Sequence, residues 1–537
     1  MAYGQEEYQR IDHDDQFEEP WKGTGPAPTR PNYQRGGARG NESWNADPDL
    51  EDSDYGYSVS RRDGARPRNS YAQGPVNPRR NYDGYSNPGY PQSNGYGPRY
   101  DGGGLNSVRY RQEQGGVKKK INPLAPKKLR NMPAYPEDAD ESGRIPKTRM
   151  LGVLEMHPNG YGFIRDPRQN YDRQFTDPFV SSGAISKLQL REGVEIDAII
   201  RPRRSANGPG PRVLQINKVG GGEPSAYRDR RDFEDLVPVP PNQWLRLEDP
   251  DDEKCPLSMR VIDIMAPLGK GQRALIVAPP RSGKTVLLQQ IATSLAKKKP
   301  DADGRKIKVI VLLIDERPEE VTDFIRTVPS DVEVLASSLD KELESHIRLA
   351  QFVTKRCKSL VEMGEDVVLL LDSITRLARA FNKWVGNSGR TMTGGVDVNA
   401  MNIPKKIFSS ARSIDGNKGS LTIIGTALID TGSRMDELIF QEFKGTGNME
   451  LVLDRNLAER RIWPAIDVSK SGTRREELLL GNVKLSDDPR SKVDLLRDIT
   501  RLRRALATRD HVEAMAQLVQ TLEKYRNNEE FFEKCFH

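Results

Sequence analysis

The stretch Ala278-Pro-Pro-Arg-Ser-Gly-Lys-Thr285 decides how the largest part of this 537-residue chain folds. An apolar run at 273–277 leads into it and a helical apolar pattern at 286–295 follows it, the strand–loop–helix setting of a phosphate-binding loop. Backbone N–H groups of such a loop meet phosphates at a helix N-terminus, where the helix dipole favours negative charge. We therefore expect Lys284 to reach the β- and γ-phosphates of ATP and Thr285 to bind Mg²⁺. Ala278 replaces the usual first glycine, so the loop taken alone also fits a plain helix start.

Two further apolar runs end in acidic residues. The run 309–314 leads to Asp315-Glu316, and the run 367–371 leads to Asp372. Ligands collect at the carboxyl ends of parallel strands, so we expect Glu316 to orient or deprotonate the water that attacks the γ-phosphate. Asp372 is expected to hold Mg²⁺ through its waters. Either residue alone would more often cap a helix, but together with the upstream loop they favour a nucleoside triphosphatase.

The alternation of apolar runs and helical patterns over 255–481 predicts an α/β domain built on a parallel sheet. Within it, the Gly-, Ser- and Thr-rich stretches 386–396 and 430–436 suit a phosphodiester chain held by backbone N–H groups and hydroxyls, although each in isolation fits a turn. Arg474 fits either a finger that enters a neighbouring subunit's site or a surface salt bridge, and the sequence leaves both open. Residues 482–537 are predicted to be helical, for packing or subunit contact, from the spacing of Leu495, Ile499, Leu502 and Leu506.

Residues 147–222 have a different pattern, with five short apolar runs broken by Gly and Pro. Five strands in so short a segment predict a small barrel of the oligonucleotide-binding type. Tyr161 and Phe163 alternate, so both face one side of a strand, and with Arg165 alongside they predict a platform on which bases stack. Phe179 is a candidate third ring. The alternative is that these rings belong to the core. Further phosphate-directed charge is expected from Arg201, Arg203, Arg204 and Arg212.

The first 146 residues are rich in Gly, Pro, Asn, Ser, Arg and Tyr and poor in aliphatic residues, so we expect a disordered tail. Tyr and Arg among glycines suit contact with single-stranded RNA or weak self-association; a solubilising tail without a partner is the alternative. Residues 223–254 are expected to connect the barrel to the ATPase domain. The net charge of +6 permits a nucleic-acid partner. Without an 18-residue apolar run or a signal peptide, a cytoplasmic protein is expected.

From about Met150 to its C-terminus the chain resembles the bacterial transcription termination factor Rho family. The stretches that carry the resemblance are 314–321 (IDERPEEV), 371–379 (LDSITRLAR), 393–397 (TGGVD), 443–451 (FKGTGNMEL) and 471–474 (SGTR). The resemblance implies a RecA-like P-loop ATPase domain after an OB- or cold-shock-like barrel. It also implies a homohexamer that is an RNA-dependent ATPase and 5′→3′ RNA/DNA helicase, using ATP and Mg²⁺ and releasing nascent RNA from the RNA polymerase elongation complex.

The resemblance also assigns residues. Glu316 and Asp372 match the catalytic glutamate and the Walker B aspartate, Arg474 the arginine finger supplied by a neighbour, and Arg461 a further arginine at the subunit interface. Trp463 matches an aromatic that packs on adenine. The other nucleotide-binding positions are Pro280, Arg281, Ser282, Gly283, Lys284, Thr285 and Val286. The RNA-binding positions are Tyr161, Phe163, Arg165 and Phe179 in the barrel, and Thr393, Gly394, Gly395, Val396, Thr431 and Arg434 in two pore loops.

Three positions depart from the family pattern: Arg281 and Arg434 stand where lysines are familiar, and Val213 where a tyrosine is familiar. Two other classes of protein stay open. A rotary-ATPase catalytic subunit shares the loop and the strand-end glutamate but has no RNA dependence, and the Gly-Tyr-Gly-Phe segment counts against it. A passive RNA-binding scaffold has no turnover, and the set Lys284, Glu316 and Asp372 counts against it.

Overall fold

A computed structural model describes residues 147–202, 210–301, 304–386, 392, 394–416, 418–481, 483 and 493–537. The predicted tail, Arg203, Arg204 and Thr393 lie outside the described residues. No helix among those that are described is long and apolar enough to cross a membrane.

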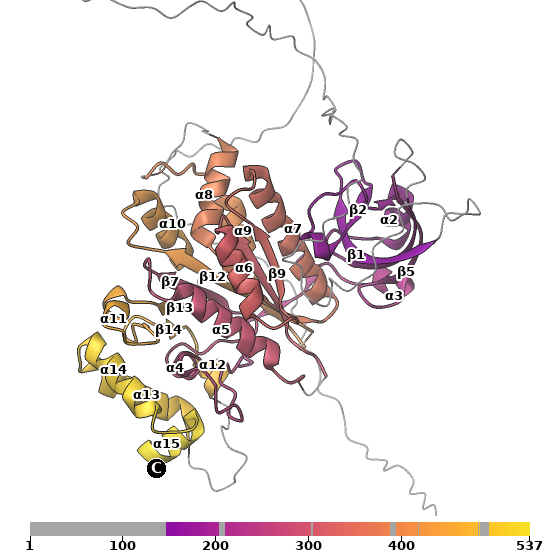
Figure 1. The fold of residues 1–537 in the computed structure, drawn as a ribbon. Coiled ribbons are helices and arrows are strands. Elements are labelled where there is room, and N and C mark those ends of the chain that lie inside the picture. Colours follow the sequence, from indigo (N-terminus) through magenta and orange to yellow (C-terminus); the bar gives the residue numbers. More distant parts are fainter. Residues whose placement is uncertain are drawn as a thin grey trace, which may run out of the picture. The chain divides into compact units, whose positions relative to one another are not determined.

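The first folded part is a closed five-stranded barrel with the strand order β1-β2-β3-β5-β4 (Figure 1). Its strands are β1 (Thr148–Met156), β2 (Gly162–Arg165), β3 (Phe179–Val180), β4 (Glu195–Arg201) and β5 (Arg212–Val219), with the helices α2 (Ser182–Leu188) and α3 (Pro224–Arg228). The five predicted strands are confirmed. Apolar side chains that alternate along the strands, such as Met150, Leu154, Ile196 and Ala198, fill the interior.

The second folded part is an α/β domain around a nine-stranded sheet, whose main path is β14-β13-β7-β12-β10-β8-β9. Strands β13 to β9 along this path run parallel, whereas β14 pairs antiparallel with β13. The bounds are β7 (Arg273–Ala278), β8 (Lys308–Ile314), β9 (Glu333–Ser337), β10 (Asp366–Asp372), β12 (Ser420–Leu428), β13 (Met449–Val452) and β14 (Gly472–Thr473). Off the path, β11 (Arg412–Ile414) pairs with β12 and with β6 (Pro238–Val239). The predicted parallel α/β sheet is confirmed.

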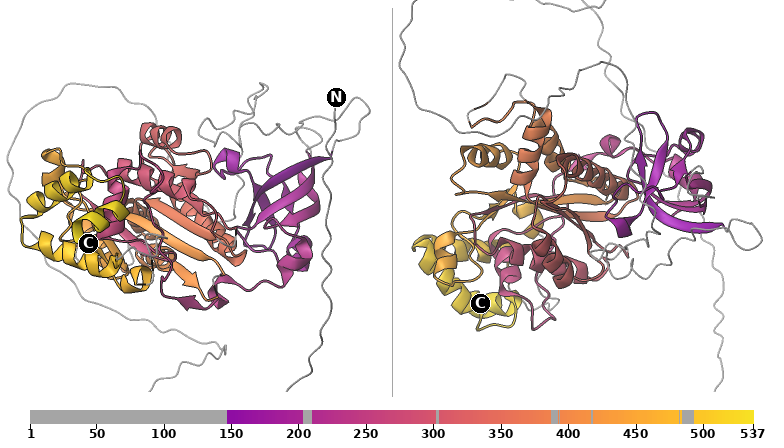
Figure 2. Two further views of the ribbon diagram at one scale, coloured as in Figure 1. Left: turned by 90° about the horizontal axis from the view of Figure 1, so that it is seen from below. Right: turned by 45° about the horizontal axis from the view of Figure 1, so that its top comes forward.

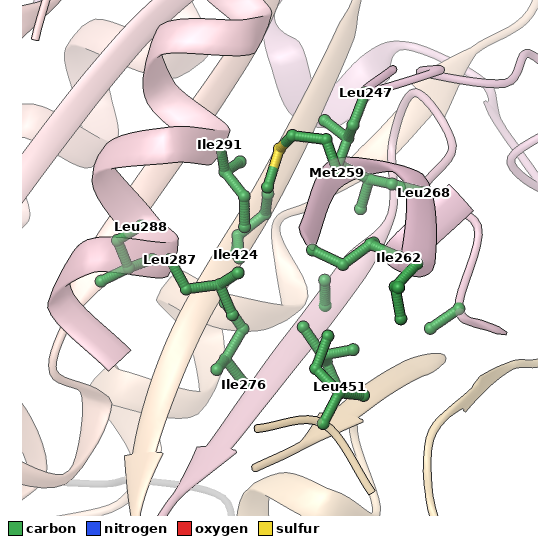
Figure 3. Packing of buried hydrophobic residues seen from close by; sticks show 14 of the residues in the cluster. Leu247, Met259, Ile262, Leu268, Ile276, Leu287, Leu288, Ile291, Ile424 and Leu451 are labelled. Atoms are coloured by element: carbon green, nitrogen blue, oxygen red, sulfur yellow. The ribbon is translucent and has the colours of Figure 1, made fainter. Parts of the chain in front are cut away.

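Helices cover both faces of this sheet (Figure 2). One face packs on α4 (Leu257–Met265), α5 (Lys284–Lys297) and α6 (Pro318–Thr327), and the other on α7 (Leu343–Glu362), α8 (Ile374–Val385), α9 (Asn402–Ser409) and α10 (Arg434–Lys444). Strand β7 shows why its sequence is a continuous apolar run. Ala274 and Ile276 enter one core and Leu275 and Val277 the other, so no side is left for polar residues. Figure 3 shows Ile276 with Leu287 and Ile291 of α5.

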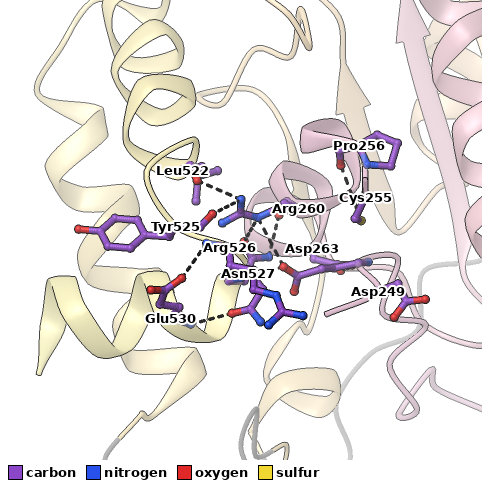
Figure 4. Close-up of polar contacts among 12 residues, drawn as sticks. Asp249, Cys255, Pro256, Arg260, Asp263, Leu522, Tyr525, Arg526, Asn527 and Glu530 are labelled. Atoms are coloured by element: carbon purple, nitrogen blue, oxygen red, sulfur yellow. Dashed lines mark hydrogen bonds and ion pairs between the residues drawn. The ribbon is translucent and has the colours of Figure 1, made fainter. Parts of the chain in front are cut away.

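The C-terminal segment is helical, as the apolar spacing predicts, with α13 (Leu495–Ala507), α14 (His511–Leu522) and α15 (Asn528–Phe536). Leu495, Ile499 and Leu506 are buried. Arg260 of α4 ties this segment to the domain, because its Nη1 donates to the backbone oxygens of Leu522 (3.0 Å) and Tyr525 (2.9 Å) (Figure 4). Two short helices, α11 (Arg455–Glu459) and α12 (Glu477–Leu480), lie between the sheet and this segment in the chain.

Candidate nucleotide and RNA sites

The predicted phosphate loop lies between the end of β7 at Ala278 and the start of α5 at Lys284. Gly283 precedes the helix with φ of 84°, and Arg281 also has a positive φ, of 65°. The buried Ser282 hydroxyl donates to the backbone oxygen of Pro279 at 2.8 Å, which closes the loop on itself. The first N–H groups of α5 therefore face the space at the strand ends, where an anion is favoured by the helix dipole.

Two of the predicted catalytic side chains, Glu316 and Asp372, meet the predicted phosphate-binding Lys284. Lys284 Nζ lies 2.5 and 2.6 Å from the two carboxylate oxygens of Asp372 and 3.5 Å from Glu316 Oε1. Thr426 of β12 donates to Asp372 Oδ1 at 2.7 Å, an orienting contact that the sequence did not reveal. The convergence follows from topology, because β7, β8 and β10 are parallel and their carboxyl ends lie at the same edge of the sheet.

Glu316 is buried, and burial raises its pKa to about 7. The groups around it act in both directions: Lys284 and Arg376 lower this pKa, whereas Asp372 and the neighbouring Glu320 raise it. Arg376 Nη2 lies 3.2 Å from Glu316 Oε2, yet that oxygen makes no hydrogen bond within the described residues. A buried carboxylate with a pKa near neutrality, one oxygen of which makes no hydrogen bond in the described part of the chain, has the properties of a general base for water.

The hydroxyl of Thr285 and the carboxylate of Asp372 are hard oxygen donors at the helix start and the strand end. Among the described residues, no group of three or more His, Cys, Asp and Glu side chains could hold a metal ion. One carboxylate and one hydroxyl fit Mg²⁺, which keeps several waters and takes its other ligands from substrate phosphates. They do not fit an ion that needs a full set of protein ligands.

Beside the loop is a largely apolar pocket of about 500 Å³. Its lining includes Gly283, Val286, Leu257, Leu453, Trp463 and Ala465. Trp463 is 44% exposed, and its ring lies so close to Gly283 that a Cβ there would be 2.7 Å from Cζ3. The predicted adenine-packing residue therefore lies against the phosphate loop. Leu257, Leu453 and Ala465 were not predicted, because they come from distant segments whose apolar side chains do not differ in sequence from core residues.

The two candidate interface arginines lie apart from this cluster. Arg474 is exposed, and its backbone N–H donates to the backbone oxygen of Asn448 at 2.9 Å, next to the start of β13. Because β13 is parallel to β7, that point is at the opposite strand end from the phosphate loop, on the order of 15–20 Å away along the strand. Arg474 therefore cannot serve the phosphate site of its own chain without a large movement. Arg461 is exposed, near Trp463, with φ of 61°.

The two predicted pore loops are in contact. A Cβ on Gly394 would lie 3.1 Å from the backbone oxygen of Arg434. Thr431 donates to Asp436 Oδ2 at 2.6 Å, and Arg379 Nε donates to the other oxygen of Asp436 at 2.7 Å. Thr431, Arg434 and Gly395 are exposed, and Gly394 is half-buried. Val396 differs from the expectation, because its side chain is buried in the core and cannot itself contact RNA.

In the barrel, the three predicted rings form one cluster. Ring centroids lie 5.8 Å apart for Tyr161 and Phe163, 5.4 Å for Tyr161 and Phe179, and 6.0 Å for Phe163 and Phe179. His157, which was not predicted, stacks on Tyr161 at 4.4 Å. A Cβ on Gly162 would lie 2.7 Å from Leu154 Cδ1, so this glycine permits the close approach of β1.

Arg165 lies beside these rings, as predicted, but is buried. Its guanidinium is 5.0 Å from the Phe163 centroid, forms an ion pair with Glu155 and donates to Asp177 at 2.6 Å. Burial raises the pKa of Asp177 to about 6. The Arg165 side chain thus packs against the ring of Phe163. It also lines a cavity of about 810 Å³ together with Phe163, Phe179, Phe175 and Arg212. Phe175, 77% exposed, was missed because a lone Phe in a polar loop carries no periodic signal.

Two family matches divide the chain as its two folded parts do. Residues 150–225 match the Rho termination factor, RNA-binding domain, and residues 258–473 match the nucleotide-binding domain of the ATP synthase alpha/beta family. Transcription termination factor Rho of Aquifex aeolicus is 45% identical over 394 residues, which are 72% of this chain and 85% of that protein. The Rho of Haemophilus influenzae is 46% identical over 71% of this chain and 86% of that protein. The chain belongs to the Rho family of transcription termination factors.

As a member of the Rho family, the chain is an RNA-dependent ATPase and helicase that acts in transcription termination. The barrel argues against the rotary-ATPase alternative, because it matches the Rho RNA-binding domain, whereas the ATP synthase alpha/beta match covers the second folded part only. A solved ATPase of a bacterial type III secretion system aligns at 22% identity with a TM-score of 0.43, over 61% of this chain and 89% of that chain, which is too weak to add to the assignment.

Proposed function

We propose that this chain forms a homohexameric ring in the cytoplasm, moves 5′→3′ along single-stranded RNA, and releases the transcript from the RNA polymerase elongation complex. We also propose the domain bounds 147–222 for the RNA-binding barrel, 255–481 for the ATPase domain and 482–537 for its helical C-terminal part. The observation that carries the proposal is the meeting of Lys284, Glu316 and Asp372 within 3.5 Å in a chain that also carries the three-ring cluster.

In the nucleotide site, the phosphate loop and Lys284 hold the triphosphate, and Trp463 packs on adenine over the apolar pocket. Thr285 and Asp372 hold Mg²⁺, which when bound neutralises charge on the phosphates. Glu316, with its pKa near neutrality, accepts the proton of the attacking water. Arg474 supplies positive charge to the site of the next subunit, since its place at the far strand end leaves it distant from its own.

On the RNA side, Tyr161, Phe163 and Phe179 stack bases, each contact contributing about 1–3 kcal/mol. Gly394, Gly395, Thr431 and Arg434 contact the RNA backbone in the ring's channel, with Thr393 expected beside them. Arg461 acts at the subunit boundary. Hydrolysis at that boundary moves these loops and pulls the strand.

The test is ATP hydrolysis by the purified chain with and without poly-cytidylate, together with its mass in solution when nucleotide and RNA are both present. We expect strong stimulation by RNA, loss of turnover when Mg²⁺ is chelated, and a mass of six subunits. An unchanged rate without RNA, or a single subunit in the presence of both ligands, would contradict the proposal.

A further inference from the structure

Strand β9 is the last strand on the β8 side of the main sheet path, so one of its sides has no neighbouring strand in that path. On that side, the side-chain amide of Asn170 in the barrel pairs with both backbone groups of Ala336. Its Nδ2 donates to the Ala336 oxygen at 2.6 Å, and its Oδ1 accepts from the Ala336 N–H at 2.9 Å. One side chain thus satisfies a donor and an acceptor that a neighbouring strand would otherwise pair.

The conformation of Asn170 is suited to this contact. It ends the short helix η1 (Pro167–Gln169) with φ of 55°, a left-handed conformation that asparagine tolerates better than most residues. Tyr171 follows with the same φ and is buried. Its hydroxyl donates to Glu333 Oε1 at 2.5 Å, at the other end of β9. The turn at 170–171 therefore contacts β9 at two residues, Ala336 and Glu333.

The opposite side of β9 is hydrogen-bonded to the segment that carries Glu316. The backbone oxygen of Ser337, one residue after Ala336, accepts the N–H of Asp315 at 2.8 Å. The N–H of Leu339 donates to the backbone oxygen of Glu316 at 2.9 Å. Asp315 has φ of 58°, so these two bonds hold a strained turn that aims Glu316 toward Lys284 and Asp372.

The turn at Asn170 and Tyr171 is also bound by Arg348, which connects it to the residues beside the aromatic rings. Arg348 of α7 donates to the backbone oxygen of Tyr171 at 2.6 Å and to the carboxylate of Glu155 at 2.7 and 2.9 Å. Glu155 is the ion-pair partner of Arg165, whose guanidinium lies against Phe163. Contacts thus run without a gap from the aromatic rings to the end of β9.

We propose that Asn170 is a positioning residue for ATP hydrolysis, through which the RNA-binding barrel fixes the direction of Glu316. This inference rests on the proposed role of Glu316 as general base. In this proposal Asn170 touches neither ATP nor RNA. It fixes Ala336 by two hydrogen bonds, and the adjacent Ser337 in turn accepts the N–H of Asp315.

The test compares Asn170→Gly with Asp172→Ala in the full-length protein. Glycine accepts the φ of 55°, so only the two hydrogen bonds are removed. Asp172 is the matched control: it lies in the same turn and contacts Lys341 at 3.3 Å, but not β9. With saturating poly-cytidylate, we expect kcat of Asn170→Gly to fall about 10- to 100-fold. The KM for ATP and the Kd for a short oligocytidylate should stay within about twofold of the unaltered protein.

Two readouts separate positioning from general loosening. The midpoint of the kcat–pH profile should move toward acid in Asn170→Gly, because a loosened Glu316 gains water, and should not move in Asp172→Ala. Asn170→Asp, which places a carboxylate oxygen against the Ala336 backbone oxygen, should lose at least as much activity as Asn170→Gly. A kcat of Asn170→Gly equal to that of Asp172→Ala, an unmoved pH midpoint, or a parallel loss of RNA affinity would overturn the inference. Glu316→Gln under the same conditions tests the proposed function separately: if it is inactive while Asn170→Gly is normal, only this inference fails.

Discussion

The ring of Trp463 occupies the place that a side chain on Gly283 would need. A Cβ atom on Gly283 would lie 2.7 Å from Trp463 Cζ3 and 3.5 Å from two further ring atoms. These residues are 180 positions apart in the chain, yet they join the phosphate end of the nucleotide site to its apolar pocket. Gly283 is thus constrained twice, by this contact and by its φ of 84°.

Gly283→Ala is therefore expected to raise the KM for ATP at least tenfold, because it displaces the tryptophan and strains the loop at once. Gly445→Ala is the matched control, since Gly445 has a helical φ of −64° and a Cβ there would meet nothing within 4 Å. ATP titrations of both variants check this. Equal KM values for the two variants would contradict it.

The pH dependence of turnover follows from the pKa of Glu316, about 7, which burial raises. Only the carboxylate accepts a proton, so kcat at saturating ATP and RNA should rise with pH, with a midpoint near 7, and level off about one pH unit higher. Arg376 lowers this pKa, so Arg376→Gln should move the midpoint toward alkaline pH. Glu316→Gln should abolish turnover at every pH. A flat profile between pH 6 and 8 would count against Glu316 as the base.

The same residue should lower stability at alkaline pH. The pKa of Glu316 in the fold is above its unfolded value of 4.5. The contribution of Glu316 to the free energy of unfolding is therefore fully present below about pH 4.5 and is lost as pH rises through about 7. Glu316→Gln carries no buried charge and is expected to be more stable than the unaltered protein at pH 8, by about 1–3 kcal/mol. Urea unfolding of both proteins at pH 5 and pH 8 measures this, and a variant that gains nothing at pH 8 would contradict it.

Replacing Tyr161 and Phe163 together by alanine should weaken binding of a short single-stranded oligocytidylate by about 2–4 kcal/mol, since two stacking surfaces are lost. ATP affinity without RNA should be unchanged. Leu214→Ala is the control, because Leu214 is also an exposed apolar residue of the barrel, 46% exposed on β5. Filter binding or anisotropy would measure the affinities, and a double variant that binds as tightly as Leu214→Ala would remove the stacking platform.

Arg260→Ala should destabilise the attachment of α14 and α15, because the backbone oxygens of Leu522 and Tyr525 lose the hydrogen bonds from the buried Arg260 guanidinium. The expected loss is about 2–4 kcal/mol, seen as a lower Tm. Arg526→Ala, at an exposed side chain in the same segment, should be nearly neutral. If both variants melted at the same temperature, the assigned role of Arg260 would be wrong.

The sequence by itself determined the local chemistry of this protein. The phosphate loop, the strand ends at Glu316 and Asp372, and the alternation of Tyr161 and Phe163 all depend on patterns within a few residues, and parallel strands bring such ends to one edge. Strands β9 and β13 were not predicted, since each is short, contains a glutamate (Glu333 or Glu450) and lacks the continuous apolar run of the other parallel strands.

Only the tertiary structure decided what distant segments do to one another. It buried Arg165 between Glu155 and Asp177, set Arg474 at the far strand end, and placed Asn170 on Ala336. Each of these depends on burial and on pairing between residues far apart in the chain, and a side chain such as Asn170 has the same sequence signature whether it faces water or completes the edge of a sheet.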